Sequence, residues 1–98
     1  MDKTLKNYIA GLNVPWLEDE LGKYRIRILG RGETGFYEQG VDGDQVLVFE
    51  LDPRESCVFS KSLRKWDSGK RVTAEQQQAI VARLLRYLSR DGSSPQVR

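Results

Sequence analysis

The feature that most constrains this chain is the run QVLVFEL at residues 45–51, its most hydrophobic candidate strand. The β-branched and aromatic residues of this run favour a pleated strand that packs on at least one face. Glycine and aspartate at residues 40–44 are typical of a hairpin turn before the strand, and Pro53 removes a ladder hydrogen bond after it. The sequence therefore predicts a central strand between two turns.

Three shorter segments predict strands beside this one. Residues 24–29 alternate Tyr24 and Ile26 with Arg25 and Arg27, which indicates a strand with one polar face. Residues 34–39 follow a glycine turn as a second strand, and residues 56–60 follow Pro53 as a fourth. Each connection is too short for a parallel crossover, so the four strands are expected to form an antiparallel meander in chain order.

The clearest helix is predicted after residue 73. Thr73 is a good N-cap, and Gln76 completes a capping box with it. An apolar stripe at helical spacing follows and ends before Gly92. The residues of this stripe are Ile80, Val81, Leu84, Leu85 and Leu88.

The N-terminal part is expected to add a short helix. Leu5, Ile9 and Leu12 have the spacing of one apolar stripe on residues 3–12. Residues 14–21 fit either a second helical turn, with Pro15 at its first position, or an irregular loop anchored by Trp16. Both alternatives are compatible with the sequence.

These elements predict an α+β fold in two layers. A four-stranded antiparallel meander sheet would be covered by the C-terminal amphipathic helix, with the short N-terminal helix at an edge or end. Residues 1–92 are expected to form one domain, and residues 93–98 a disordered tail. The uncovered face of the sheet would carry Arg25, Arg27 and Glu50 and be available for binding.

Composition argues against several classes of protein. No apolar run approaches the roughly 18 residues that cross a bilayer, and residues 1–12 do not read as a secretory signal, so we expect a cytoplasmic protein. The chain has no histidine, which removes the common nucleophile–imidazole pairs and imidazole metal sites. We expect no catalytic residues, no cofactor and no metal. Cys57 and Trp66 are interpreted as core residues.

Charge is unevenly distributed along the chain. Residues 33–55 contain seven acidic side chains and one arginine, whereas residues 56–98 contain nine basic and three acidic ones. Such asymmetry influences association rate and choice of partner more than it influences the fold. The acidic middle and the basic C-terminal part are therefore both candidate binding surfaces.

The acidic segment contains two patterns that could indicate a site. Asp42 and Asp44 flank a glycine, but they lack the further ligands of a calcium loop, so a plain hairpin turn is preferred. Glu38 and Glu50 are expected on neighbouring strands, as surface acids opposite Arg25 or Arg27 and not as a catalytic pair.

The basic segment could hold nucleic acid. Arg83, Arg86 and Arg90 have helical spacing on the face away from the leucines, and a basic face binds phosphates by counterion release. A solvated helix face is the other interpretation, and few aromatic residues interleave with the patch. We therefore rank nucleic-acid binding below binding to a protein.

A wider pattern covers about residues 36–90. Its parts are Tyr37-Glu38 before a glycine turn, the run 46–51, the strand 57–59 with Ser60 and Ser62, Lys65-Trp66-Asp67, and the helix from Thr73 and Gln76 to Tyr87-Leu88. This pattern resembles a family of small bacterial immunity proteins, which protect cells from polymorphic or contact-dependent growth-inhibition toxins. Residues 1–22 lie outside the resemblance.

The resemblance implies a non-enzymatic inhibitor that binds one cognate toxin, often a basic nuclease, in the cytoplasm. Opposite surface potentials would speed the encounter, and carboxylates over a nuclease cleft would mimic phosphates. The expected contact residues are Glu33, Glu38, Asp42, Asp44 and Glu50. The alternatives are a nucleic-acid-binding accessory protein that uses the basic C-terminal region and, ranked last, an enzyme; the oligomeric state stays open.

Overall fold

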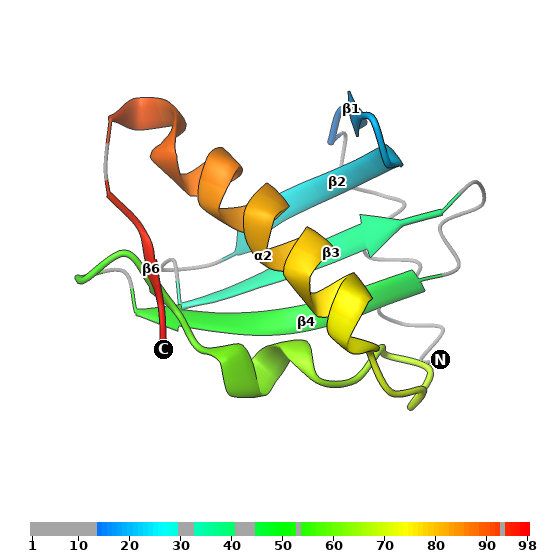
Figure 1. Cartoon of the computed structure of the whole chain (residues 1–98). Helices are drawn as coiled ribbons and strands as arrows, with labels where there is room; N and C mark the ends of the chain where they lie inside the picture. The colour runs from blue at the N-terminus through cyan, green and yellow to red at the C-terminus, as the bar shows by residue number, and fades with distance from the viewer. Residues whose placement is uncertain (1–13, 30–32, 41–44, 53, 93) are drawn as a thin grey trace.

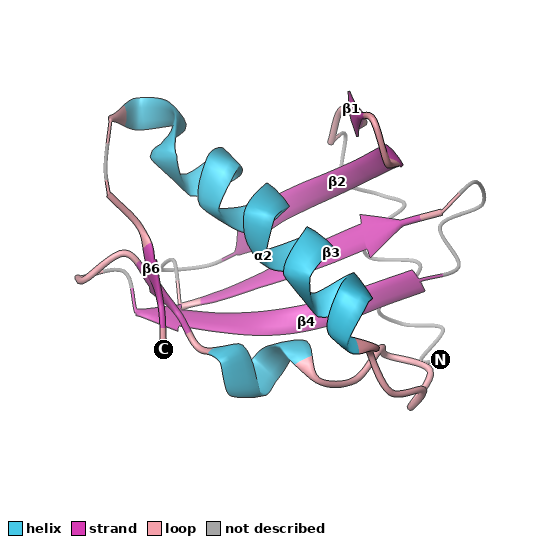
Figure 2. Ribbon diagram, in the orientation of Figure 1, coloured by secondary structure: helices cyan, strands magenta, loops and turns pink. Residues whose placement is uncertain are grey.

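The computed structural model of the 98-residue chain describes residues 14–29, 33–40, 45–52, 54–92 and 94–98. One long helix crosses one face of a curled sheet (Figures 1 and 2). The described elements are β1 (Leu17–Asp19), β2 (Gly22–Leu29), β3 (Thr34–Gln39), β4 (Gln45–Asp52), β5 (Cys57–Val58), the 3-10 helix η1 (Ser60–Leu63), α2 (Ala74–Leu88), the 3-10 helix η2 (Ser89–Asp91) and β6 (Gln96–Val97).

The α+β class is confirmed, but the sheet differs from the expected one. Six strands pair in the order β1-β2-β3-β4-β5-β6, and β6 lies parallel to β5, so the sheet is mixed and not a four-stranded antiparallel meander. The expected strand at residues 56–60 is only Cys57–Val58. It stops early because the Ser62 hydroxyl lies 2.7 Å from the Phe59 carbonyl and accepts the Glu50 backbone N–H at 2.9 Å, which stabilises η1 instead.

Residues 14–21 contain strand β1, and so they form neither the helical turn nor the irregular loop that the sequence allowed. Leu17 pairs with Tyr24 and Asp19 with Gly22, which makes a tight antiparallel hairpin with β2. The Asp19 carboxylate accepts the backbone N–H of Leu21 at 2.9 Å, and Gly22 has a φ of +124°, a value that favours glycine. The helical prediction is wrong here because the aspartate closes a turn and does not begin a helix.

The end of the chain also differs from the expectation. Gln96 donates its backbone N–H to the Ser56 carbonyl at 2.9 Å, and Arg98 donates to Val58 at 2.9 Å, so this segment is a strand and not a disordered tail. An ion pair of 2.5 Å between Arg98 and Glu55 adds to these bonds. The helix expected at residues 3–12 lies outside the described residues, as do positions 41–44 of the expected turn.

The main core lies between the sheet and α2. Ile80 and Leu84 of the helix are fully buried against Tyr37, Leu47 and Phe49 of the central strands. Leu63, Trp66 and Val72 close the core at the side of β4, and Cys57 is buried, as expected for both Trp66 and the thiol. A smaller cluster of Phe36, Val46, Val14 and Leu29 lies on the opposite face of the sheet.

Helix α2 begins as the sequence predicts. The Gln76 backbone N–H donates to Thr73 Oγ1 at 3.1 Å, and the Gln76 side chain accepts the Thr73 N–H at 2.9 Å, which completes the capping box. Val81 and Leu88 pack against the core from half-buried positions. No helix within the described part of the chain is long and apolar enough to cross a membrane.

Candidate functional site

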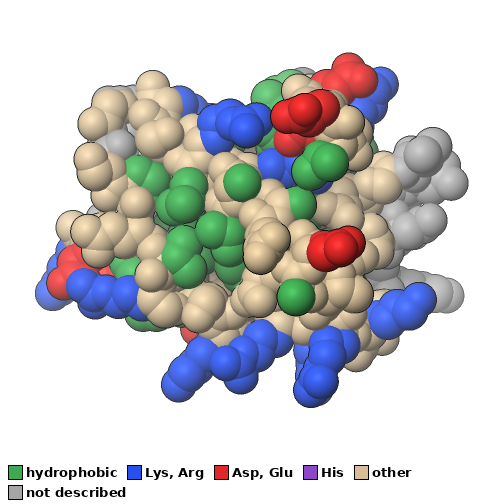
Figure 3. Space-filling view, viewed as in Figure 1, with side chains coloured by type: hydrophobic (Ala, Val, Ile, Leu, Met, Phe, Trp, Pro, Cys, Tyr) green, Lys and Arg blue, Asp and Glu red, His purple; other side chains and the backbone are tan. Residues whose placement is uncertain are grey.

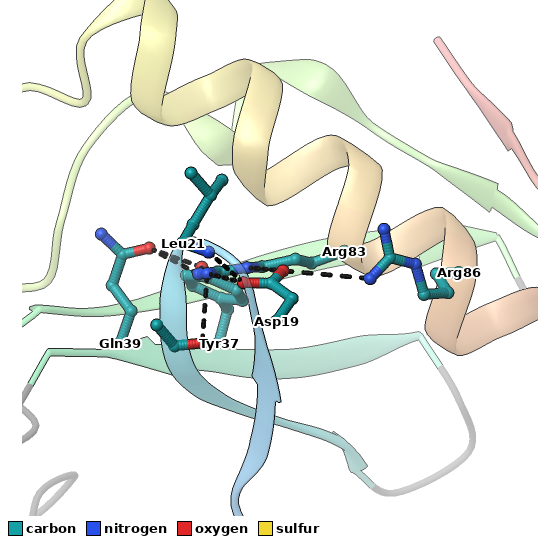
Figure 4. A network of polar contacts seen from close by, with 7 residues as sticks. Asp19, Leu21, Tyr37, Gln39, Arg83 and Arg86 are labelled. Carbon is teal, nitrogen blue, oxygen red and sulfur yellow. Dashed lines mark hydrogen bonds and ion pairs between the residues drawn. The ribbon is translucent and has the colours of Figure 1, made fainter.

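A buried ion pair joins the first hairpin to the helix. Arg83 of α2 is 3% exposed and donates from Nε to Asp19 Oδ2 at 2.8 Å and from its NH2 group to Asp19 Oδ1 at 2.7 Å (Figure 4). Two parallel bonds of this kind match the geometry of a carboxylate and are stronger than a single bond. The pair therefore holds β1 against α2 across 64 positions of sequence.

The same arginine begins a chain of hydrogen bonds that crosses the sheet. Its NH1 group donates to the Tyr37 hydroxyl at 2.6 Å, which lies 2.5 Å from Gln39 Oε1. Gln39 Nε2 donates to Gln45 Oε1 at 2.8 Å, and the guanidinium carbon lies 4.4 Å from the centre of the Tyr24 ring. Among the described residues, no buried side-chain nitrogen or oxygen lacks a partner. The network thus fixes one arrangement of the hairpin, sheet and helix.

These contacts set the charges in the network. Hydrogen bonding to Arg83 lowers the pKa of Asp19 to about 2, against a smaller opposing effect of burial. Burial raises the pKa of Tyr37, and the bond to Asp19 raises the pKa of Arg83. Near neutral pH the Asp19 carboxylate and the Arg83 guanidinium are therefore charged, and the Tyr37 phenol is neutral. None of these three groups is poised for proton transfer, so the network has a structural role.

The ion pair predicts a pH dependence of stability. Because the pKa of Asp19 is lower in the folded protein than its ordinary value of 3.8, the pair contributes fully above about pH 5 and less as the pH falls from 4 towards 2. Urea unfolding at several pH values should therefore show that the difference in free energy of unfolding between the wild type and Asp19→Asn decreases across this range. A difference that stays constant from pH 7 to pH 2.5 would contradict the assignment.

The position of Arg83 corrects the expected basic face of the helix. Arg83 points into the protein, whereas Arg86 is 64% exposed and lies 3.9 Å from Asp19, and Arg90 stacks 3.9 Å from the centre of the Tyr87 ring. A signal for this was in the sequence, since Arg83 lies three residues after Ile80 and such pairs share a helix face. Arg83, Arg86 and Arg90 therefore do not form one exposed patch.

Two of the expected contact residues meet at one end of the sheet. Glu33 precedes β3 and Glu50 lies near the end of β4, and both are exposed. They line an open hollow of about 460 Å³ together with Asp52, Arg54 and the half-buried Phe59, which we call the acidic hollow. Among the described residues of this lining, three carboxylates face one guanidinium, which favours a negative potential. Sequence reasoning counted Asp52 in the acidic segment but did not place it in the contact surface.

The other expected contact residues are elsewhere. Glu38 is 4% exposed and accepts a hydrogen bond from Arg25 Nε, so the expectation of an exposed contact is wrong, although the pairing with Arg25 is as expected. Burial follows because Glu38 neighbours Phe36 and Val46 on the same face of the sheet. Asp42 and Asp44 lie outside the described residues. Among the residues that are described, no group of acids and cysteine could hold a metal ion.

A second hollow lies at the opposite end of β3. It measures about 850 Å³ and is lined by residues of the β1–β2 hairpin, the end of β3, the start of β4 and the first turns of α2, and we call it the hairpin hollow. Trp16, Leu21 and Glu75 are part of this lining, with Arg83 beside them. Figure 3 shows hydrophobic, acidic and basic side chains close together at the upper right of the molecule.

A third concave surface, of about 650 Å³, follows the exposed side of α2 next to β6. Its apolar residues are Val81, Ala82, Leu85 and Val97, which are half-buried or exposed.

Comparison of the chain with known proteins gave no match to a family model, to a curated protein or to a solved structure.

Proposed function

We propose that this chain is a non-enzymatic immunity protein that binds and neutralises a cognate bacterial toxin, and that the acidic hollow contacts the toxin. The observation that supports the proposal is the convergence of Glu33, Glu50 and Asp52 in one open concavity, whose described lining contains one arginine. A basic protein such as a nuclease is the complementary partner, because opposite potentials raise the association rate and disfavour other partners.

The surroundings of the acidic hollow suit a protein partner. Val48 lies two residues before Glu50 in β4, so both side chains are on the same face of the sheet, and Val48 is 40% exposed. A partner protein can cover this apolar side chain while its own lysine or arginine residues bind the neighbouring carboxylates at the rim of the interface. Carboxylates that become fully buried against such a partner would also slow dissociation.

If the proposal is right, the gene directly upstream should encode the toxin, so the test uses the product of that gene. Co-purification establishes binding, and growth of cells that express the toxin measures protection. The double variant Glu33→Lys, Glu50→Lys should weaken binding at least about tenfold, with the larger defect at low salt because exposed charges are less screened there. The matched control is Lys65→Glu, Lys70→Glu, which reverses two exposed charges elsewhere and should bind as the wild type does.

The outcomes separate the function from the surface. If the wild type neither binds the toxin nor protects cells, the chain is not its immunity protein. If the wild type binds but protection is lost only in the double variant Lys65→Glu, Lys70→Glu, the toxin uses the basic side of the molecule. Arg83 is unsuitable as a control because its substitution would also disturb the core.

Nucleic-acid binding is the second candidate, and one observation favours it. The stretch from η1 to the start of α2 presents several exposed basic side chains, along the lower edge of the view in Figure 3. These are Lys61, Arg64, Lys65, Lys70 and Arg71. Fluorescence anisotropy with a single-stranded oligonucleotide should show only weak binding that falls steeply with salt. A nanomolar complex at physiological salt would reverse the ranking of the two functions.

A further inference from the structure

We propose that the hairpin hollow is a second docking surface, which takes a segment of a partner protein that carries basic side chains among apolar ones. It is separate from the acidic hollow, because β3 begins beside one hollow and ends beside the other. Six residues of strand span roughly 20 Å. This surface is therefore independent of the contact assigned to the toxin above.

Exposed apolar side chains concentrate at this hairpin. The described residues include four large apolar side chains that are exposed, and three of them are Trp16, Leu17 and Leu21, which are 41%, 37% and 69% exposed. A cluster of this kind on a small domain marks a protein-interaction site more often than scattered exposure does. Trp16 and Leu21 both line the hollow, so they are the expected anchors.

The anchors are held in place before any partner binds. The Arg25 guanidinium carbon lies 4.6 Å from the centre of the Trp16 ring, and the Asp19–Arg83 pair fixes the hairpin against α2. Ordering of loops and side chains is a large cost of association, and a fixed surface avoids part of it. The hairpin is thus prepared for binding although its apolar residues face solvent.

The charges of the hollow select the partner. Glu18 and Glu75 line it, Glu20 lies in the hairpin turn, and all three are exposed and make no ion pair with a described residue. Lys23 is the one opposing charge in the described lining apart from Arg83, whose charge is balanced by Asp19. The local potential is therefore negative and favours lysine or arginine.

The same charges argue against a second copy of this chain as the occupant. A symmetric contact places the same surface patch of each protomer against the other, so the glutamates of the two hairpins would face each other. Like charges placed opposite each other oppose association. A basic, apolar segment of another protein avoids this repulsion and covers the exposed Trp16 and Leu21.

The experiment selects 12-residue peptides from a random phage library on the immobilised wild-type protein. Enriched peptides should combine lysine or arginine with leucine or aromatic residues. A synthetic peptide with an enriched sequence should bind the protein variants Leu21→Glu and Glu75→Lys at least about tenfold more weakly than the wild type. The first variant loses an anchor and the second a complementary charge. The matched control is Val48→Glu, which places a charge at an exposed apolar residue outside the hollow and should leave affinity unchanged.

NMR amide shifts locate the bound peptide. Shifts should concentrate at residues 16–23 and 75–79, and the spectra of the free variants should show that each is folded. The proposal is overturned if no peptide is enriched over the bare support, if the enriched peptides are acidic, or if Val48→Glu loses binding while Leu21→Glu keeps it. Because no toxin is used, a failure here is separate from a failure of the immunity function.

Discussion

Replacing Arg83 with methionine should destabilise the folded protein by about 3 to 5 kcal/mol, the usual effect of removing one partner of a buried ion pair. Methionine keeps much of the length of the side chain but donates no hydrogen bonds. The Asp19 carboxylate, which is 11% exposed, would then lose its bidentate partner, and the Tyr37 hydroxyl would lose its donor. Equilibrium unfolding in urea at pH 7 measures the loss directly.

Arg86→Met is the matched control for this prediction. Arg86 lies three positions further along the same helix, and its guanidinium is 3.9 Å from the same carboxylate, but the side chain is 64% exposed. An exposed pair contributes about 1 kcal/mol or less, so this variant should unfold nearly as the wild type does. Equal losses in the two variants would show that Asp19 does not depend on Arg83 in particular.

A double variant isolates the pair itself. If Asp19→Asn is combined with Arg83→Met, no buried charge is left unpaired, and the combined loss should be smaller than the sum of the two single losses. Losses that simply add would mean that the two side chains do not interact in the folded protein. This result would also remove the basis for the pH dependence predicted for Asp19.

Leu84→Ala should cost about 2 to 5 kcal/mol, because it empties space in a packed core. Leu84 is fully buried against the sheet, while Leu85 is half-buried and lines the surface groove beside β6. The sequence places both leucines in one apolar stripe and predicts similar losses for them. The structure separates them, and Leu85→Ala should cost only about 1 kcal/mol, close to the average for a substitution.

The pair of leucine variants tests how α2 is rotated on the sheet. Both substitutions remove the same atoms from adjacent positions of one helix, so differences in helix propensity cancel. Thermal and urea unfolding should rank Leu84→Ala well below Leu85→Ala in stability. The reverse order would mean that the helix packs on the sheet by a different face.

The rigid network and the proposed docking surface are connected by the first hairpin. Asp19 is bound by Arg83, and the exposed Trp16 and Leu21 lie within three residues of Asp19 on either side. A buried, fully bonded ion pair often adds less stability than apolar packing would, but it can fix a unique arrangement. In this protein it holds an exposed apolar hairpin in a defined position.

Local patterns in the sequence were sufficient for the central strands and the helix. Alternation in β2, the apolar run in β4 and the capping box at Thr73 each involve residues close together in the chain, and all are found in the structure. Glu33 and Glu50 were identified as exposed acids, and the register of β3 and β4 brings them to one hollow. The surface role assigned to them remains a proposal.

Partners distant in the chain decided the remaining features. Asp19 closes a hairpin and meets Arg83, 64 positions away, and Gln96 pairs with a strand some 40 positions earlier. Glu38 is buried because neighbouring strands supply Arg25, Phe36 and Val46 around it. Such pairings carry no local periodicity, because their energy depends on which segments the completed sheet and helix bring together. The sequence by itself determined the elements with their own pattern, and the tertiary structure alone decided which distant residues pair with the buried polar side chains.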